Sequence, residues 1–160
     1  MVAKTSLSKY EIERNKPTPS LNHGYVQNNI TGVLFPFRNK YTVVSEVKLK
    51  LSPDQLESIP DISIFPPISI DFGNDQIAVT VPPTTAVEIL SPTQSFVELI
   101  EKAKTYFKYE VKSCWIVVPA LKNIFVFYSP DDYQMFRHTE ELYDKHLDLT
   151  LALKEIFFER

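Results

Sequence analysis

Residues 85–92 read TAVEILSP, an apolar run that carries one carboxylate, Glu88, and stops at a Ser-Pro pair. Successive side chains of a strand point to opposite faces, so Val87 and Ile89 share one face and Glu88 lies on the other. A buried carboxylate is costly unless a cation, a proton or several hydrogen-bond donors compensate it. We therefore predict a buried strand with a functional acid at Glu88. An edge strand or a plain buried ion pair would explain the same pattern.

The segment that follows has the pattern of an amphipathic helix. Ser95 and Glu98 have the spacing of a capping box, which satisfies free N–H groups at a helix start. Apolar residues then recur at helical spacing, namely Phe96, Leu99, Ile100, Ala103 and Phe107. The sequence predicts a helix over residues 95–109, then strands over 114–118 and 123–128.

The chain before residue 85 predicts one more helix and further strands. Ser20 can cap a helix over 21–35, whose apolar stripe comprises Val26, Ile30, Val33, Leu34 and Phe37. Apolar and charged residues alternate over 41–51, which is typical of a half-buried strand, and residues 60–65 (PDISIF) open another. Residues 76–81 have a hairpin-like strand pattern.

Strands interrupted by helices indicate a mixed β-sheet with helices packed on it, so the predicted fold class is α/β or α+β. The 160 residues, 44% of them hydrophobic, suffice for one core. We expect a single domain over 1–160, with a core of about 10–130 and a C-terminal extension of about 131–160. The pattern of residues 149–158 leaves helix and strand open.

Composition excludes several classes of protein. The single cysteine, Cys114, cannot form an internal disulfide and lies in an apolar run, so we expect a buried core residue. The first six residues lack the apolar region of a leader, and no run reaches the length of a membrane span, so we expect a cytoplasmic protein. A formal net charge of -3 argues against a general nucleic-acid coat protein but leaves a locally basic groove open.

Two acids are candidates for a metal site. Asp61 follows Pro60 at the start of a predicted strand, and Glu88 lies in a later buried strand. Carboxylates from neighbouring strands supply the hard oxygen ligands that Mg²⁺ or Mn²⁺ prefers, and they leave positions open for water and a phosphate. We therefore expect Asp61 and Glu88 to bind a divalent metal. The alternative for Asp61 is an ordinary turn, where Asp is common.

Lys102 is the candidate cation. It lies on the margin of the apolar stripe of the predicted helix, from which its stem can bring the ammonium to a nearby cleft. An exposed pair with Glu98 is the plain alternative. Glu46 and His23 are additional candidates, although Glu46 shares a polar face with lysines and His23 borders the stripe of the first helix. No second His or Cys stands at ligand spacing from His23, which argues against zinc.

Four segments occur in the order and spacing of a known family: 60–65 (PDISIF), 87–93 (VEILSPT), 101–106 (EKAKTY) and 115–119 (WIVVP). They resemble the Uma-type restriction endonuclease family, which is abundant in cyanobacteria. The resemblance covers about residues 10–130. The family belongs to the PD-(D/E)xK nuclease superfamily, so the resemblance implies a restriction-endonuclease-like fold with a central mixed sheet flanked by helices.

The resemblance implies a Mg²⁺- or Mn²⁺-dependent endonuclease that hydrolyses phosphodiester bonds of nucleic acid, with DNA as the expected substrate. Asp61 and Glu88 match the metal-binding acids, and Glu46 matches an acid often present upstream. The usual superfamily lysine, two residues after the second acid, is Leu90 here. Lys102 matches the position on the following helix to which this family moves it. A homodimer is expected, because two sites could then address both strands of a duplex.

Three positions depart from the family pattern: its helix-ending Gly is Glu110, its following Pro is Lys112, and its Asp before the final Pro is Val118. Two rival functions stay open. One is a catalytically silent nucleic-acid-binding module that retains the nuclease fold. The other is an assembly protein that pairs subunits through aromatic residues, for instance Tyr106, Tyr109, Phe125 and Phe127. The candidate phosphate contacts are the lysines at 48, 50, 102, 104, 108 and 112.

Overall fold

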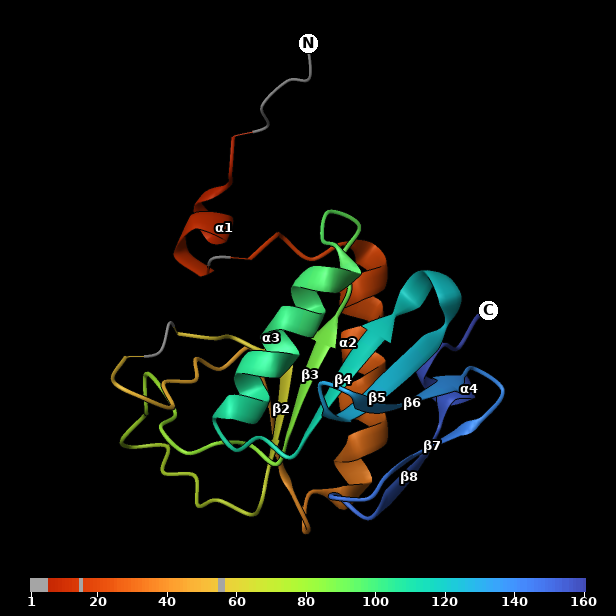
Figure 1. The fold of residues 1–160 in the computed structure, drawn as a ribbon. Coiled ribbons are helices and arrows are strands. Elements are labelled where there is room, and N and C mark those ends of the chain that lie inside the picture. The colour runs from red at the N-terminus through yellow and green to blue at the C-terminus, as the bar shows by residue number, and fades with distance from the viewer. Residues whose placement is uncertain (1–5, 15, 55–56) are drawn as a thin grey trace.

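The computed structural model describes residues 6–14, 16–54 and 57–160. Residues 1–5, on which the expectation of no leader segment rests in part, lie outside the described residues. The described residues form one six-stranded sheet in the order β1-β2-β3-β4-β5-β6 (Figure 1). β3 and β4 are parallel, and the other neighbouring pairs are antiparallel. The sheet is therefore mixed and flanked by helices, which confirms the predicted α/β class.

The elements follow one another in a simple order along the chain. The strands of the sheet are β1 (Thr42–Ser45), β2 (Ile62–Phe65), β3 (Thr85–Ile89), β4 (Ser113–Val118), β5 (Asn123–Ser129) and β6 (Asp132–Arg137). A separate hairpin consists of β7 (Glu141–Asp144) and β8 (Leu149–Ala152). The helices are α1 (Lys9–Arg14), α2 (Leu21–Leu34), α3 (Phe96–Lys108) and α4 (Leu153–Ile156), with 3-10 turns η1 (Phe35–Phe37) and η2 (Pro119–Leu121).

The two long helices cover opposite faces of the sheet (Figure 1). α2 packs on the face that carries Val87 and Ile89, whereas α3 packs on the face that carries Ala86. Every residue of β3 is buried, as expected for a strand with helices on both sides. The alternation in residues 85–90 therefore predicted correctly which side chains share a face.

Both long helices begin at their predicted caps. The hydroxyl of Ser95 accepts a hydrogen bond from the backbone N–H of Glu98, and the Glu98 carboxylate accepts one from the backbone N–H of Ser95. At the start of α2, the Ser20 hydroxyl accepts from the backbone N–H of His23. These local signals fix where α2 and α3 start, and so place His23 and Lys102 along them.

Two predicted strands differ from the structure. The strand predicted over 41–51 ends at Ser45, because Glu46 has a φ of 53° and its left-handed backbone turns the chain out of the sheet. Residues 76–81 form no strand, and their only pairing among the described residues is an isolated bridge between Val79 and Leu49. One isolated bridge does not make the continuous ladder of a strand pair.

The chain after residue 130 completes the core. β6 extends the sheet beyond β5, and residues 149–158, which the sequence left open, form β8 and then α4. Apolar residues of this region join the α2 side of the core: Leu142, Leu147, Leu149, Leu151, Leu153 and Ile156. Within the described part of the chain, none of the helices combines the length and the apolar composition of a bilayer span.

Candidate active site

Strand pairing brings the two predicted acids together. In the antiparallel ladder of β2 and β3, Ile62 lies opposite Val87, so Asp61 and Glu88 come next to each other at the same end of the sheet. The backbone N–H of Ile89 donates a 2.7 Å hydrogen bond to Oδ2 of Asp61. Both carboxylates are nearly closed to solvent, with side-chain exposures of 4% for Asp61 and 3% for Glu88.

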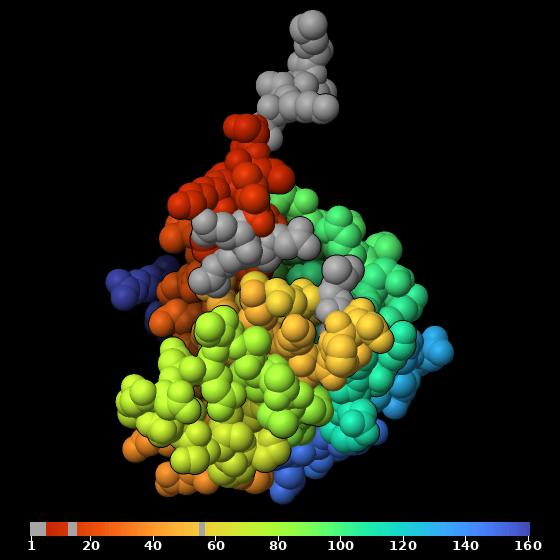
Figure 2. Space-filling view, turned by 90° about the vertical axis from the view of Figure 1, so that its left-hand side faces the viewer, coloured from red at the N-terminus to blue at the C-terminus, as the bar shows by residue number. Residues whose placement is uncertain are grey.

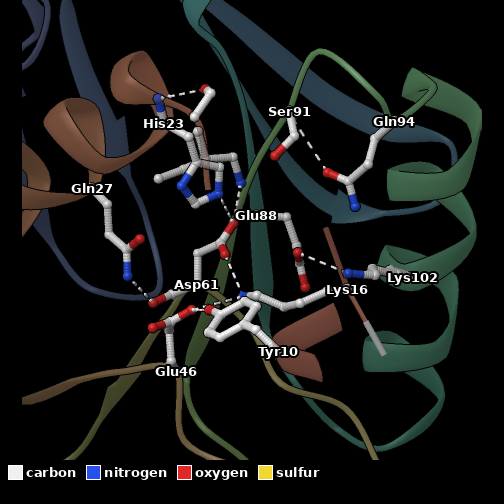
Figure 3. A network of polar contacts seen from close by, with 12 residues as sticks. Tyr10, Lys16, His23, Gln27, Glu46, Asp61, Glu88, Ser91, Gln94 and Lys102 are labelled. Atoms are coloured by element: carbon white, nitrogen blue, oxygen red, sulfur yellow. Dashed lines mark hydrogen bonds and ion pairs between the residues drawn. The ribbon is translucent and has the colours of Figure 1, made fainter. Parts of the chain in front are cut away.

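Asp61 is held as a charged carboxylate by two basic side chains (Figure 3). Nζ of Lys16 lies 2.6 Å from Oδ1 of Asp61, and Nε2 of His23 lies 3.1 Å from Oδ2. Burial alone would raise the pKa of Asp61, but the hydrogen bond from His23 and the charge of Lys16 outweigh it, and the pKa lies below its ordinary value. These contacts thus favour the anionic form of Asp61.

Glu46 is a third acid at this end of the sheet. It follows β1, and its backbone N–H donates a hydrogen bond to the backbone carbonyl of Asp61. Its Oε1 lies 3.3 Å from Nζ of Lys16 and accepts a 2.9 Å hydrogen bond from the Tyr10 hydroxyl (Figure 3). The left-handed backbone that ends β1 therefore belongs to a residue of the acid cluster, a common place for backbone strain.

Glu88 faces α3, where Lys102 and Tyr106 meet it. Nζ of Lys102 lies 3.1 Å from Oε2 of Glu88, and the Tyr106 hydroxyl donates to Oε1. Burial raises the pKa of Glu88 above its ordinary value, although the charge of Lys102 opposes this shift. Glu98, the alternative partner of Lys102, serves in the capping box instead. Leu90, where the superfamily usually has lysine, packs against the apolar α3 side of the core.

His23 is a positioning residue in this arrangement. Its residue exposure is 3%, and its Nε2 contacts Asp61 from the first turn of α2. Nδ1 of His23 is buried and has no hydrogen-bond partner among the described residues. The imidazole therefore orients Asp61 through one nitrogen, while the other accepts or donates no hydrogen bond within the described part of the chain.

Two residues of the cluster, Tyr106 and Lys16, are not among the site residues that the sequence predicts. Tyr106 is named above as an aromatic residue that could pair subunits, yet Tyr106 stands four residues after Lys102, so the two side chains share one helix face. That spacing could have identified it. Lys16 lies in a segment without any periodic pattern, and no sequence signal indicated it. The complete burial of Tyr106 and the near-complete burial of Phe127 also argue against the aromatic docking surface considered above.

The cluster is closed, but pockets border it on two sides. The space enclosed directly between Lys16, His23, Asp61, Glu88 and Lys102 is only ≈ 10 Å³, about enough for one water molecule. A pocket of ≈ 600 Å³ adjoins it, lined among others by Lys16, Lys102, Gln94 and Glu98. Another of ≈ 390 Å³ lies along the start of α2.

The donor chemistry of the cluster fits a hard divalent cation. Asp61 and Glu88 are carboxylates from adjacent strands, and Glu46 lies within reach of the same ammonium as Asp61. As the side chains stand, the charge of Lys16 compensates these acids. Over residues 6–14, 16–54 and 57–160, no group of three or more His, Cys, Asp or Glu side chains is arranged to hold a metal. Each of the two neighbouring carboxylates already has partners: Asp61 contacts Lys16 and His23, and Glu88 contacts Lys102 and Tyr106.

Known proteins resemble the chain in both fold and sequence. The crystal structure of a "putative nuclease belonging to DUF820" from Anabaena variabilis matches with a TM-score of 0.72 and 22% sequence identity. The match covers 89% of this chain and 83% of that one, so the two share a fold. Curated proteins give no match. The model of the Uma2 family, described as "Putative restriction endonuclease", matches residues 4–156, and the chain therefore belongs to the Uma2 family.

Proposed function

We propose that the protein is an endonuclease that hydrolyses phosphodiester bonds of DNA, with Mg²⁺ or Mn²⁺ held by Asp61 and Glu88. The observation that carries the proposal is the pairing of these two buried acids at one end of the sheet, with Lys102 3.1 Å from Glu88 and at the edge of a wide pocket. Membership of a restriction endonuclease family supports the same chemistry.

Each side chain of the cluster has its own role in the proposed reaction. Asp61 and Glu88 bind the cation, which when bound supplies Lewis-acid stabilisation of a phosphoryl oxygen and lowers the pKa of water. The side chain of Lys102 is 35% exposed and can therefore contact a phosphate, where its charge stabilises the negative charge that develops during hydrolysis. His23 and the N–H of Ile89 hold Asp61 in place. Tyr106 holds Glu88 from the opposite side.

The substrate is a polyanion, although the chain has a formal net charge of -3. Lys16 and Lys102 line the ≈ 600 Å³ pocket beside Glu11 and Glu98, and Lys102, whose side chain is 35% exposed, is the lysine of this pocket that a phosphate can reach. Of the other candidate lysines, Lys48 is paired with Glu57 and Lys104 with Glu101.

Two copies of the chain would present two such pockets to a duplex, and light scattering with and without a short duplex tests this dimer.

A cleavage assay tests the proposed activity. Supercoiled plasmid, single-stranded DNA and RNA are incubated with Mg²⁺, with Mn²⁺ or with chelator. The wild type is compared with Asp61→Asn, Glu88→Gln and, as a control, Glu101→Gln, whose side chain is 61% exposed. We expect metal-dependent cutting of DNA by the wild type and the control. Each site variant should lose at least about 100-fold in rate.

The same proteins separate this proposal from the rival of a silent binding module. If no substrate is cut but Mn²⁺ still raises the melting temperature of the wild type and not of Asp61→Asn, the metal site exists without turnover. Cutting by Asp61→Asn at the wild-type rate would contradict the proposed site altogether.

A further inference from the structure

The two edges of the six-stranded sheet differ in how they are protected. An edge strand presents unpaired N–H and C=O groups, and natural proteins blunt such an edge with a short strand, charges, proline or a covering segment. β1 has only 4 residues and ends at the left-handed Glu46. Residues 66–84 (yellow-green) spread over this side of the molecule (Figure 2), and the backbone N–H of Ile68 donates to the Thr42 hydroxyl. The β1 edge is therefore short and partly covered.

The opposite edge, β6, lacks these protections over its middle in the described part of the chain. β6 is the outermost strand beyond β5 (Figure 1) and has 6 residues, of which the central four, 133–136 (YQMF), carry no charge. Tyr133 and Met135 are 54% and 40% exposed on one face of the strand, and Gln134 is exposed on the other. Both faces of this edge are thus open to another strand.

The hydrogen bonds of Arg137 show which residues of β6 point their backbone groups outward. The backbone N–H of Arg137 donates to the Glu140 carboxylate, and the backbone carbonyl of Arg137 accepts from the N–H of Glu140. In an antiparallel ladder every second residue turns its N–H and C=O away from the paired strand, so Met135 and Tyr133 point outward as Arg137 does. Within residues 6–14, 16–54 and 57–160, the outward groups of Met135 and Tyr133 have no partner.

One antiparallel register lets two copies of this edge satisfy each other about a two-fold axis. In it, Tyr133 of each copy lies opposite Met135 of the other, so both outward positions pair, and Gln134 lies opposite itself at the axis. A register centred on Met135 would instead set Tyr133 against Arg137, whose outward groups are already bound. The free groups of β6 therefore select the register centred on Gln134.

The side chains match in this register as well. Tyr133 packs on Met135 of the second copy, a favourable contact of sulfur with an aromatic ring that covers an exposed apolar side chain of each copy. At both ends of the pair, Arg137 comes opposite Asp131, an exposed residue of the turn between β5 and β6, so opposite charges meet. A strand that complements itself in hydrogen bonds, apolar contact and charge favours a second copy of the chain as its partner.

We propose that β6 is the contact surface with a second copy of the chain, in which the two β6 strands pair antiparallel about a two-fold axis at Gln134. The pairing joins the two sheets into one. The inference goes beyond the proposed function, because β6 is separated from β3 by β4 and β5 and contributes none of the clustered acids. The contact holds whether or not the protein cleaves nucleic acid.

Sedimentation of the full chain over a range of concentrations is the first test, and it compares the wild type with Met135→Pro and Phe72→Lys. Proline at position 135 removes an outward N–H and no hydrogen bond to β5, so the fold is retained while the contact between copies loses a donor from each strand. Phe72, which is 97% exposed in segment 66–84, is the control on the other edge. We expect the wild type and Phe72→Lys to dimerise equally, and Met135→Pro at least about tenfold more weakly.

Disulfide trapping tests the register and leaves the backbone of β6 intact. In the proposed register Gln134 lies between two hydrogen-bonded pairs, where opposite Cα atoms are about 4.5 Å apart, within the range of a disulfide. Gln134→Cys should therefore form a covalent dimer under mild oxidation. Tyr133→Cys, whose two copies are out of step by two residues, should do so at least about tenfold more slowly. The wild type is the blank, because Cys114 is 0% exposed.

The outcomes bear on this surface alone. A wild-type dimer that Met135→Pro weakens and Gln134→Cys traps supports the β6 contact. A wild type that stays monomeric, a dimer that Phe72→Lys weakens in place of Met135→Pro, or equal trapping of the two cysteine variants overturns it. Nucleic acid and metal are absent from both experiments, so failure of the β6 contact leaves the proposed nuclease standing, and failure of the nuclease leaves the β6 contact standing.

Discussion

The hydroxyl of Tyr106 donates a hydrogen bond to Oε1 of Glu88, and both residues are buried, at 0% and 2% exposure. The contact joins α3 to β3 across the face opposite α2. It fixes one oxygen of the acid while Lys102 holds the other. Tyr106 is thus a positioning residue for Glu88, and its side chain has consequences for both stability and activity.

Tyr106→Phe should lower the free energy of unfolding by about 1–3 kcal/mol, because it leaves a buried carboxylate oxygen without its donor. Chemical denaturation measures the loss. Tyr133→Phe, at a residue that is 54% exposed, is the matched control and should change stability by less than about 0.5 kcal/mol. Equal effects of the two substitutions would contradict the role of the hydrogen bond.

Lys102→Met should reduce the rate of DNA cleavage by about 100- to 1000-fold, because it removes a charge placed to stabilise the transition state. Metal binding, measured by calorimetry, should stay within a few-fold of the wild type. Lys104→Met removes a lysine of the same helix whose ion pair is with Glu101, and it should cleave normally. Full activity of Lys102→Met would exclude the lysine from the mechanism.

Glu88→Gln should stabilise the metal-free protein at neutral pH. Burial raises the pKa of Glu88 in the folded protein above the unfolded value of about 4.3. Between the two pKa values the folded state binds more protons, so the stability of the wild type falls as pH rises through this window. Melting temperatures in chelator from pH 4 to 8 should diverge in favour of Glu88→Gln as pH rises. A constant difference across the range would contradict the ionisation argument.

Glu110→Gly should raise the free energy of unfolding by about 0.5–1 kcal/mol. Glu110 has a φ of 70° directly after the last turn of α3, a left-handed position that costs an L side chain about 1–2 kcal/mol. Glycine removes that strain. Part of the gain in stability is lost again, because glycine also gives the unfolded chain more conformational freedom. Glu101→Gly, inside the same helix, should instead destabilise by about 1 kcal/mol. Chemical denaturation measures the free energy of unfolding of both variants, and the two changes should have opposite signs.

Asp144→Ala should destabilise the protein by about 3 kcal/mol or more, because it leaves several buried hydrogen-bond donors without an acceptor. The carboxylate of Asp144 is 0% exposed and accepts hydrogen bonds from Ser113, Trp115 and the backbone N–H of His146. Asp132→Ala, at a side chain that is 63% exposed, is the control and should stay within about 0.5 kcal/mol. A mild effect of Asp144→Ala would mean that water replaces the carboxylate.

Local patterns in the sequence determined the parts of the fold that depend on neighbouring residues. The alternation in 85–90 identified β3 and the face of Glu88, and the Ser95 capping box identified the start of α3. From these two elements Lys102 could be placed near Glu88. Caps and periodicity act over a few residues, so they can be read without knowledge of the rest of the chain.

The tertiary structure decided the contacts between distant segments. The end of β1 at Glu46 follows from a backbone angle that alternation does not reveal. The pairing of β2 with β3 sets Asp61 beside Glu88, and Lys16 reaches Asp61 across 45 residues of chain. Such contacts depend on where the chain reverses and how strands pair, which is why the cation of the acid cluster could not be found in the sequence alone.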